Sequence, residues 1–138
     1  MLFIREAPGP DLRPTAAILP VAANMIGGDN DNYSAQMTEA ITSELSRLGD
    51  INVAPFASAL QVAGPHPSIH DAAAALRSRY VVDASVDDEA SGILVTARVI
   101  DAMMDRQVWV GEYRGEREDV GGMAARLAAD INAAITTP

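Results

Sequence analysis

Three strand-like segments follow one another closely in the second half of the chain, and this feature restricts the fold most strongly. Residues 79–86 (RYVVDASV), 93–101 (ILVTARVID) and 106–113 (RQVWVGEY) are rich in β-branched and aromatic side chains. The connections at residues 87–92 and 102–105 are too short for a crossover, so the three strands must be antiparallel neighbours. An antiparallel meander is therefore the frame on which the rest of the chain packs.

The first half of the chain carries two more strand candidates. Residues 15–21 (TAAILPV) form a short apolar run that Pro20 closes, which is typical of a buried strand that does not continue. Residues 51–56 (INVAPF) are the second candidate, and residues 58–67 (SALQVAGPHP) read as an irregular connection rich in turn formers. Both strands are separated from the next one by enough residues for a helix.

The segments between these strands show the periodicity of amphipathic helices. Apolar residues recur every three or four positions up to Gly49, which supplies a helix stop; they are Tyr33, Met37, Ile41, Leu45 and Leu48. Ser68 and Asp71 resemble a capping box at the start of a second helix. A third apolar stripe runs from Val120 to Ile135 and predicts the last helix.

The predicted element order is β-α-β-α-β-β-β-α, which places the chain in the α/β class. Right-handed crossovers join the first three strands in parallel. We expect three layers, with a mixed five-stranded sheet of order 2-1-3-4-5, an antiparallel fourth strand and helices on both faces. Residues 1–14 hold three prolines and read as a linker or tail, and residues 15–138 form a single domain.

Charge and composition exclude several classes of function. The formal net charge of −9 repels phosphate backbones and disfavours binding to nucleic acid or anionic membranes. No segment is apolar over a sufficient length to cross a bilayer, so we expect no direct membrane insertion. The absence of cysteine removes thiolate chemistry and disulfides but does not indicate a compartment.

The loop that precedes the first helix, residues 26–32 (IGGDNDN), invites three interpretations. It follows a strand and precedes a helix, yet it lacks the Lys and Ser/Thr of a phosphate loop. As a calcium loop it would place Tyr33 at the third ligand position. The remaining interpretation is structural, with the glycine pair turning the chain and Asp31, Asn32 or Ser34 capping the helix.

Other groups of polar residues also lack the pattern of a catalytic or metal site. His66 and His70 have helical metal-ligand spacing, but prolines flank His66 and there is no third histidine or thiolate. The acidic run Asp87–Glu89 fits a solvated turn. Met103 and Met104 in the next turn fit packing or exposed residues better than a redox site. We therefore predict no catalytic residues, no metal and no cofactor.

With this element order in place, the chain resembles the TolB N-terminal-like domains of bacterial signalling proteins. In the first half of the chain, "AAILPV" is similar to the family's first strand "AVLPF", "GGDNDNYSAQMTEAITSELSRLGD" to its "SGD" loop and "GITEDLITELSRL" helix, and "INV" to its strand "LRV". In the three antiparallel strands, "RYVVDASV" is similar to "RYVLEGSV", "VTARVIDA" to "VTAQLIDA" and "QVWVGEYRG" to "HLWAERYDR". The last helix, "DVGGMAARLAADI", is similar to "DIFALQDEIA". The resemblance extends over residues 15–135 and keeps the family's order and spacing.

The resemblance implies a non-catalytic module for protein contact, sensing or envelope assembly. Domains of this family occur beside class III adenylate or guanylate cyclase domains, beside winged-helix domains and before tetratricopeptide repeats. The implied partner is a protein or a neighbouring domain of the same polypeptide, in the bacterial cytoplasm or periplasm according to the parent protein. The alternative is a small-ligand-binding domain.

Two surfaces are candidates for these functions. The crevice at the carboxyl ends of the first and third strands is a topological switch point, and the Asn24–Asn32 loop would line it. The residues of this candidate crevice are Asn24, Gly27, Gly28, Asp29 and Asp31. The acidic lining favours a cationic or amide-rich ligand.

The second surface is the free side of the last strand. This strand has no central proline or charge to blunt its edge, apart from Gly111, which could mark a bulge, and Pro55 interrupts the opposite edge. A second copy or a neighbouring domain could pair with it. We expect Trp109 and Tyr113 on one face, Val108 and Val110 on the other, and helices covering both, with Trp109 in the core. The predicted partner edge is Val108, Trp109, Val110 and Tyr113.

Overall fold

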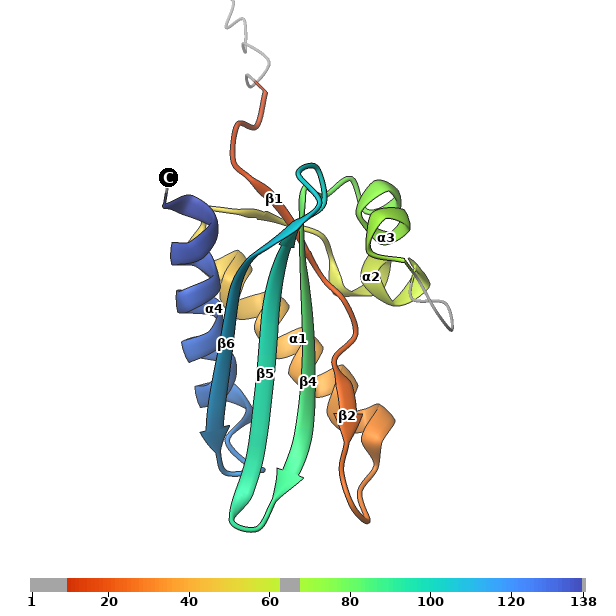
Figure 1. The fold of residues 1–138 in the computed structure, drawn as a ribbon, viewed down its shortest axis with the longest axis vertical. Coiled ribbons are helices and arrows are strands. Elements are labelled where there is room, and N and C mark those ends of the chain that lie inside the picture. The colour runs from red at the N-terminus through yellow and green to blue at the C-terminus, as the bar shows by residue number, and fades with distance from the viewer. Residues whose placement is uncertain (1–9, 63–67, 138) are drawn as a thin grey trace, which may run out of the picture.

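The computed structural model describes residues 10–62 and 68–137, which form a mixed sheet with helices packed on it (Figure 1). The elements along the chain are β1 (Thr15–Ile18), β2 (Ala22–Asn24), α1 (Asn30–Leu48), β3 (Asn52–Val53), α2 (Phe56–Val62), α3 (Ile69–Ala75), β4 (Tyr80–Glu89), β5 (Gly92–Asp101), β6 (Arg106–Gly115) and α4 (Val120–Thr136).

The sheet has the predicted strand order. Its main path is β3-β1-β4-β5-β6, which is the order 2-1-3-4-5 expected from the sequence. β1 pairs in parallel with both β3 and β4, and β5 pairs antiparallel with β4 and β6. The short connections of the meander leave β4, β5 and β6 no other arrangement, which is why this part followed from spacing alone.

The first strand continues beyond the expected stop. β1 ends at Ile18, but the chain resumes as β2, which lies beside the same strand β4 with Asn24 opposite Asp87. Pro20 lacks an N–H and interrupts the ladder without ending it, and the Leu19 N–H still donates to the Val82 carbonyl at 3.0 Å. Over residues 10–62 and 68–137, the sheet therefore has six strands instead of five.

The segment after β3 was predicted wrongly. Only Asn52–Val53 of the expected strand pairs with β1, and the chain then turns at Pro55 into helix α2 instead of an irregular connection. The N–H groups of Ser58 and Ala59 both donate to the Pro55 carbonyl. A proline fits the first turn of a helix because the N–H that it lacks would have no helical acceptor there. The remainder of the predicted connection, with His66, lies outside the described residues.

The helix ends agree with the sequence except at one cap. Gly49 adopts the left-handed conformation that ends α1 (φ 80°), and Ser68 accepts a bond from the Asp71 N–H at the start of α3, both as predicted. The α1 cap, however, is Asp29, whose carboxylate accepts from the Asn32 N–H at 3.2 Å. None of the expected caps is used, because the helix begins already at Asn30.

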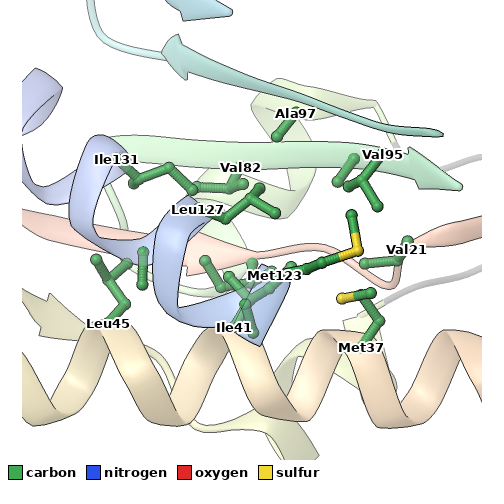
Figure 2. Close-up of a cluster of buried hydrophobic side chains, with 14 of the residues drawn as sticks. Val21, Met37, Ile41, Leu45, Val82, Val95, Ala97, Met123, Leu127 and Ile131 are labelled. Atoms are coloured by element: carbon green, nitrogen blue, oxygen red, sulfur yellow. The ribbon is translucent and has the colours of Figure 1, made fainter. Parts of the chain in front are cut away.

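The main core lies between one face of the sheet and the pair α1 and α4 (Figure 2). Met37, Ile41 and Leu45 of α1 are fully buried, whereas Leu48, at the end of the same stripe, is 46% exposed. From α4 and the sheet, the buried side chains that meet them include Met123, Leu127, Ile131, Val82, Val95 and Ala97. These helices close the core because each presents a continuous apolar stripe.

A smaller cluster lies on the opposite face of the sheet. Strand residues alternate between faces, so Val81 and Leu19 point away from the main core and contact Ala72 and Ala73 of α3. Ile69, Leu76 and Ala102 pack around this cluster. Helices thus lie on both faces, as predicted, but α2 and α3 cover only one end of the second face (Figure 1).

Candidate functional site

The last strand, β6, is the edge of the sheet that the sequence marked for partner contact. Among the described residues, no strand pairs with its outer side. Trp109 and Tyr113 pack against the main core, as expected, with ring centroids 6.5 Å apart. Val108 and Val110 are 37% and 51% exposed, so the expectation that helices cover both sides of β6 is wrong. α4 contacts β6 on the core side, whereas α2 and α3 lie beyond β4.

A bulge occurs in this edge, though not at Gly111. Val99 pairs with Trp109 and Ile100 pairs with Gln107, so the register skips Val108. Bulges of this kind increase local twist and blunt an edge near its end. Gly111 has another role: a Cβ there would lie 2.6 Å from the Trp109 ring, so the glycine makes room for the indole over the strand.

Tyr113 connects β6 to α4 through its hydroxyl group and its ring. Its hydroxyl donates to Asp130 Oδ2 at 2.5 Å, and the Arg126 guanidinium lies 6.0 Å from its ring centroid. Burial, and next the bond to the Asp130 carboxylate, raise the pKa of Tyr113 above its ordinary value. The core side of β6 is therefore held firmly, and any partner must approach its outer edge or its other side.

On that other side, β4, β5 and β6 present an uncovered surface, here called the open face. It consists of the side chains that alternate with the core residues, namely Asp83, Ser85, Asp87, Leu94, Thr96, Arg98, Val110, Glu112 and Arg114. Arg98 pairs with Asp83 at 2.6 Å, and Arg114 pairs with Glu89 at 3.1 Å. A shallow hollow of about 250 Å³ lies around Ser85 and Thr96. Such exposed pairs contribute little to stability and leave the surface free for contact.

The residues of the predicted ligand crevice do not form one group. β2 occupies the carboxyl end of β1 beside β4, and Asn24 on it donates to Asp87 Oδ1 at 3.2 Å. Gly28 and Asp29 do line a hollow of about 240 Å³, together with Asn32, Tyr33, Gln36 and Arg117. Gly27 (φ 65°) and Asp31 lie nearby in the chain but do not line it. This hollow is called the Arg117 hollow below.

Arg117 is the residue that sequence reasoning missed here. A Cβ on Gly28 would lie 2.2 Å from Arg117 Nη2, so the glycine allows the guanidinium to lie against the loop backbone. Tyr33 donates from its hydroxyl to the Arg117 carbonyl at 2.9 Å. Burial raises the pKa of Tyr33. Arg117 is 84 residues beyond Tyr33, so only the tertiary structure brings the two together.

A second missed group lies at the opposite end of the sheet, where β5 turns into β6. Asp101 is 2% exposed, accepts three hydrogen bonds from Arg79 (2.8, 3.2 and 3.3 Å), and also accepts from the N–H groups of Met103 and Met104. The Arg79 guanidinium holds the pKa of Asp101 below its usual range. The sequence signal for this group was the position of Asp101 at the end of a strand, directly before a four-residue turn. Its role is structural, because it ties the turn to the start of β4.

The described residues also show where the histidines and acidic groups lie. His70 Nε2 lies 3.0 Å from Asp105 Oδ1, at the surface where α3 meets the β5–β6 turn. In the described part of the chain, no three His, Cys, Asp or Glu side chains gather as a metal site. No helix among residues 10–62 and 68–137 has the length and apolarity needed to cross a membrane.

Comparison with known proteins gives one related sequence and several similar structures. No protein-family model matches the chain. "Putative adenylate cyclase 3" of Rhizobium meliloti (strain 1021) is 32% identical over 120 residues. The match covers 85% of this chain but only 20% of that protein. The chain is thus similar to one segment of a much longer bacterial protein.

Among solved structures, TolB from Acinetobacter baumannii superposes with a TM-score of 0.66 over 92% of this chain and 29% of TolB, at 19% identity. A PelC dodecamer from Paraburkholderia phytofirmans gives 0.54, with 95% and 96% of the two chains covered at 19% identity. The LpoB C-terminal domain from Salmonella enterica gives 0.58, with 80% and 87% covered at 16% identity. At these identities the likeness concerns the fold, and it supports the resemblance to TolB-like domains at that level.

Proposed function

We propose that this chain is a non-catalytic protein-interaction or sensory domain that acts within a larger bacterial signalling, regulatory or envelope-associated protein. The open face together with the unpaired outer side of β6 is the observation that carries the proposal. The similarity to a segment of a longer protein named as a cyclase supports an adenylate-cyclase-associated setting. The TolB and LpoB likenesses support an interaction module, with the envelope as the other setting.

The geometry favours contact through β6 over contact through the opposite edge. β3 pairs over only two residues, and Pro55 lies two residues after its end. β6 is ten residues long, and Val110 is exposed near its middle. A strand or helix laid along β6 would cover Val110 and bond with the free backbone groups beyond the bulge. The similarity to the PelC dodecamer supports the proposal that a second copy of this chain is one such partner.

Amide hydrogen exchange of Val108–Tyr113 tests the proposal. We expect slower exchange in the full-length parent protein than in this chain alone, or slower exchange at high concentration if the partner is a second copy. Val110→Glu should remove the added protection, because it places a charge in the contact. Ala129→Glu on the exposed side of α4 is the matched control and should change nothing.

Two results would contradict this proposal. One is exchange at Val108–Tyr113 that is the same in the full-length protein and in the isolated chain at every concentration. The other is a reading frame around this chain that encodes no further domain, combined with a monomer in sedimentation experiments. The first result rejects β6 as the contact surface, and the second rejects both a neighbouring domain and self-association.

The Arg117 hollow favours a second candidate function, small-ligand binding. Gly28 and Asp29, predicted for the crevice, line it, but Arg117 adds a positive charge that the sequence interpretation lacked. Thermal-shift measurements with cations, amines and short peptides test this function. A rise in melting temperature that Arg117→Ala abolishes supports it, and an unchanged melting temperature across the panel rejects it.

A further inference from the structure

A hollow of about 260 Å³ lies where β1, β3, α2 and the turn that follows α3 come together. Its floor is the start of β1 and the short strand β3, and its walls come from α2 and the turn that follows α3. Its polar side chains are Thr15, Asn52, Ser58, Arg77 and Ser78. Small residues, among them Ala54 and Ala75, line the remainder and leave the space open.

The lining is unusual for this chain because the described residues that form it include no acidic residue. The whole chain has 19 Asp and Glu against 10 Lys and Arg, yet the lining of this hollow includes Arg77 and no carboxylate. The field of the protein disfavours anions in general. Because its lining combines an arginine with neutral residues, this hollow can accommodate an anion.

Several polar side chains in the hollow can donate hydrogen bonds to a ligand. The Thr15 hydroxyl already accepts from the Arg79 N–H at 2.9 Å, so its own proton remains to be donated. Ser58 and Asn52 add a hydroxyl and a side-chain amide to the lining, and both groups can donate hydrogen bonds. The Ser78 hydroxyl donates to the Leu76 carbonyl and supplies no further donor. A ligand that offers several acceptor oxygens would match this set.

Arg77 occupies a backbone position at which glycine is normally favoured. Its φ is 50°, and the Ser78 and Arg77 N–H groups bond back to the carbonyls of Ala73 and Ala74, which is the Schellman arrangement that ends a helix. A side chain in this left-handed conformation destabilises the fold relative to glycine. Arg77 therefore lines the hollow although its backbone conformation favours glycine.

We propose that this hollow binds a small carboxylate ligand, with Arg77 pairing with the carboxylate and Thr15, Ser58 and Asn52 donating to its oxygens. The planar guanidinium matches a carboxylate with two parallel bonds. The volume is below the range of about 300–1,000 Å³ that is usual for drug-sized ligands, so the ligand has the size of an amino acid or a small organic acid. This site does not depend on the interaction surface along β6.

Titration of the ¹⁵N-labelled chain with acetate, succinate and inorganic phosphate, at ionic strength held constant with sodium chloride, tests the proposal. Saturable shifts of the Ser58, Arg77 and Ser78 amides with acetate or succinate are expected. Saturation by phosphate alone, equal shifts with chloride, or shifts confined to residues around Arg117 would each overturn it.

Three variants separate binding from folding. Arg77→Gly should weaken carboxylate binding at least tenfold while raising the melting temperature by about 2–4 °C, because glycine relieves the left-handed conformation. Arg77→Lys keeps the charge without the planar fork and should bind with intermediate affinity. Ser58→Ala should weaken binding with the fold intact. Wild-type affinity in both Arg77→Gly and Ser58→Ala would overturn the assignment.

Discussion

On the side of the sheet that α1 and α4 cover, Val95, Ala97 and Val99 of β5 are fully buried, whereas Thr96 and Arg98 of the same strand meet solvent on the other side. The first side supplies most of the apolar burial. The second has a small cluster under α3 and otherwise mainly hydroxyl groups and ion pairs, together with the exposed Val110. An antiparallel sheet can remain stable with one face in water. The covered face thus maintains the fold, and the uncovered face and edge are free to take part in binding.

The largest expected effect comes from the covered face. Leu127→Ala on α4 removes a fully buried side chain and should lower the free energy of unfolding by about 2–5 kcal/mol. Leu48→Ala, at a 46% exposed position on α1, is the control and should cost less than about 1 kcal/mol. Urea denaturation measures both. Equal losses would show that burial on this face does not dominate stability.

Trp109→Ala tests the border between the two sides of β6. The indole packs on the main core but is only half-buried, so the loss should be about 3 kcal/mol, at the low end for removal of a tryptophan. Because Trp109 is the only tryptophan, native fluorescence reports on it directly. An emission maximum at the wavelength of fully exposed indole would contradict its place in the core.

Asp101→Asn tests the tie between the β5–β6 turn and β4. The change weakens the pair with Arg79 and should cost about 1–2 kcal/mol near neutral pH, since Arg79 is 41% exposed and water replaces part of the interaction. The folded-state pKa of Asp101 is lowered, so its contribution is complete above its unfolded pKa of about 3.9 and disappears as the pH falls through the folded pKa.

The stability difference between wild type and Asp101→Asn should therefore be constant from about pH 7 to 5 and shrink below about pH 4. Asp83→Asn on the open face is the matched control. Its pair with Arg98 is exposed on both sides, and the change should cost about 0–1 kcal/mol. Thermal denaturation at several pH values measures both variants. A difference that persists unchanged at low pH would exclude the ion pair as its source.

The smallest effect on stability is expected at the surface proposed for contact. Val110→Thr leaves a β-branched residue at a 51% exposed position and should change the free energy of unfolding by no more than about 0.5 kcal/mol. Denaturation of the isolated chain measures this. A loss above about 1.5 kcal/mol would mean that the chain itself covers Val110, and would remove the contrast between the two faces.

Much of the architecture was predictable because it depends on local patterns. Short connections force β4, β5 and β6 to be antiparallel neighbours, and periodic apolar residues define α1 and α4. Local sequence did not predict β2 or α2. β2 is stabilised as a strand by pairing with β4 and follows a proline, and α2 overlaps a segment rich in turn formers. In both cases contacts from elsewhere in the chain outweigh local propensity.

The candidate sites were predictable only in part, for the same reason. The free edge of β6 followed from strand order, but the exposure of Val110 was not expected, and the bulge at Val108 required the register of β5. The crevice prediction identified Gly28 and Asp29 but had no means of finding Arg117, which comes from the far end of the chain. The hollow at Arg77 joins segments from β1, β3, α2 and the end of α3.

Side-chain periodicity and connection length act over neighbouring residues, so they were enough to predict the α/β class, the strand order and the faces of the two long helices. Which side of the sheet remains uncovered depends instead on how the helices pack. The helices α2 and α3 are short, and Ala72 and Ala73 of α3 pack over one end of the sheet near Val81. The rest of that face carries mainly polar side chains that water satisfies, with the exposed Val110 among them, so burial provides little driving force within the chain to cover it.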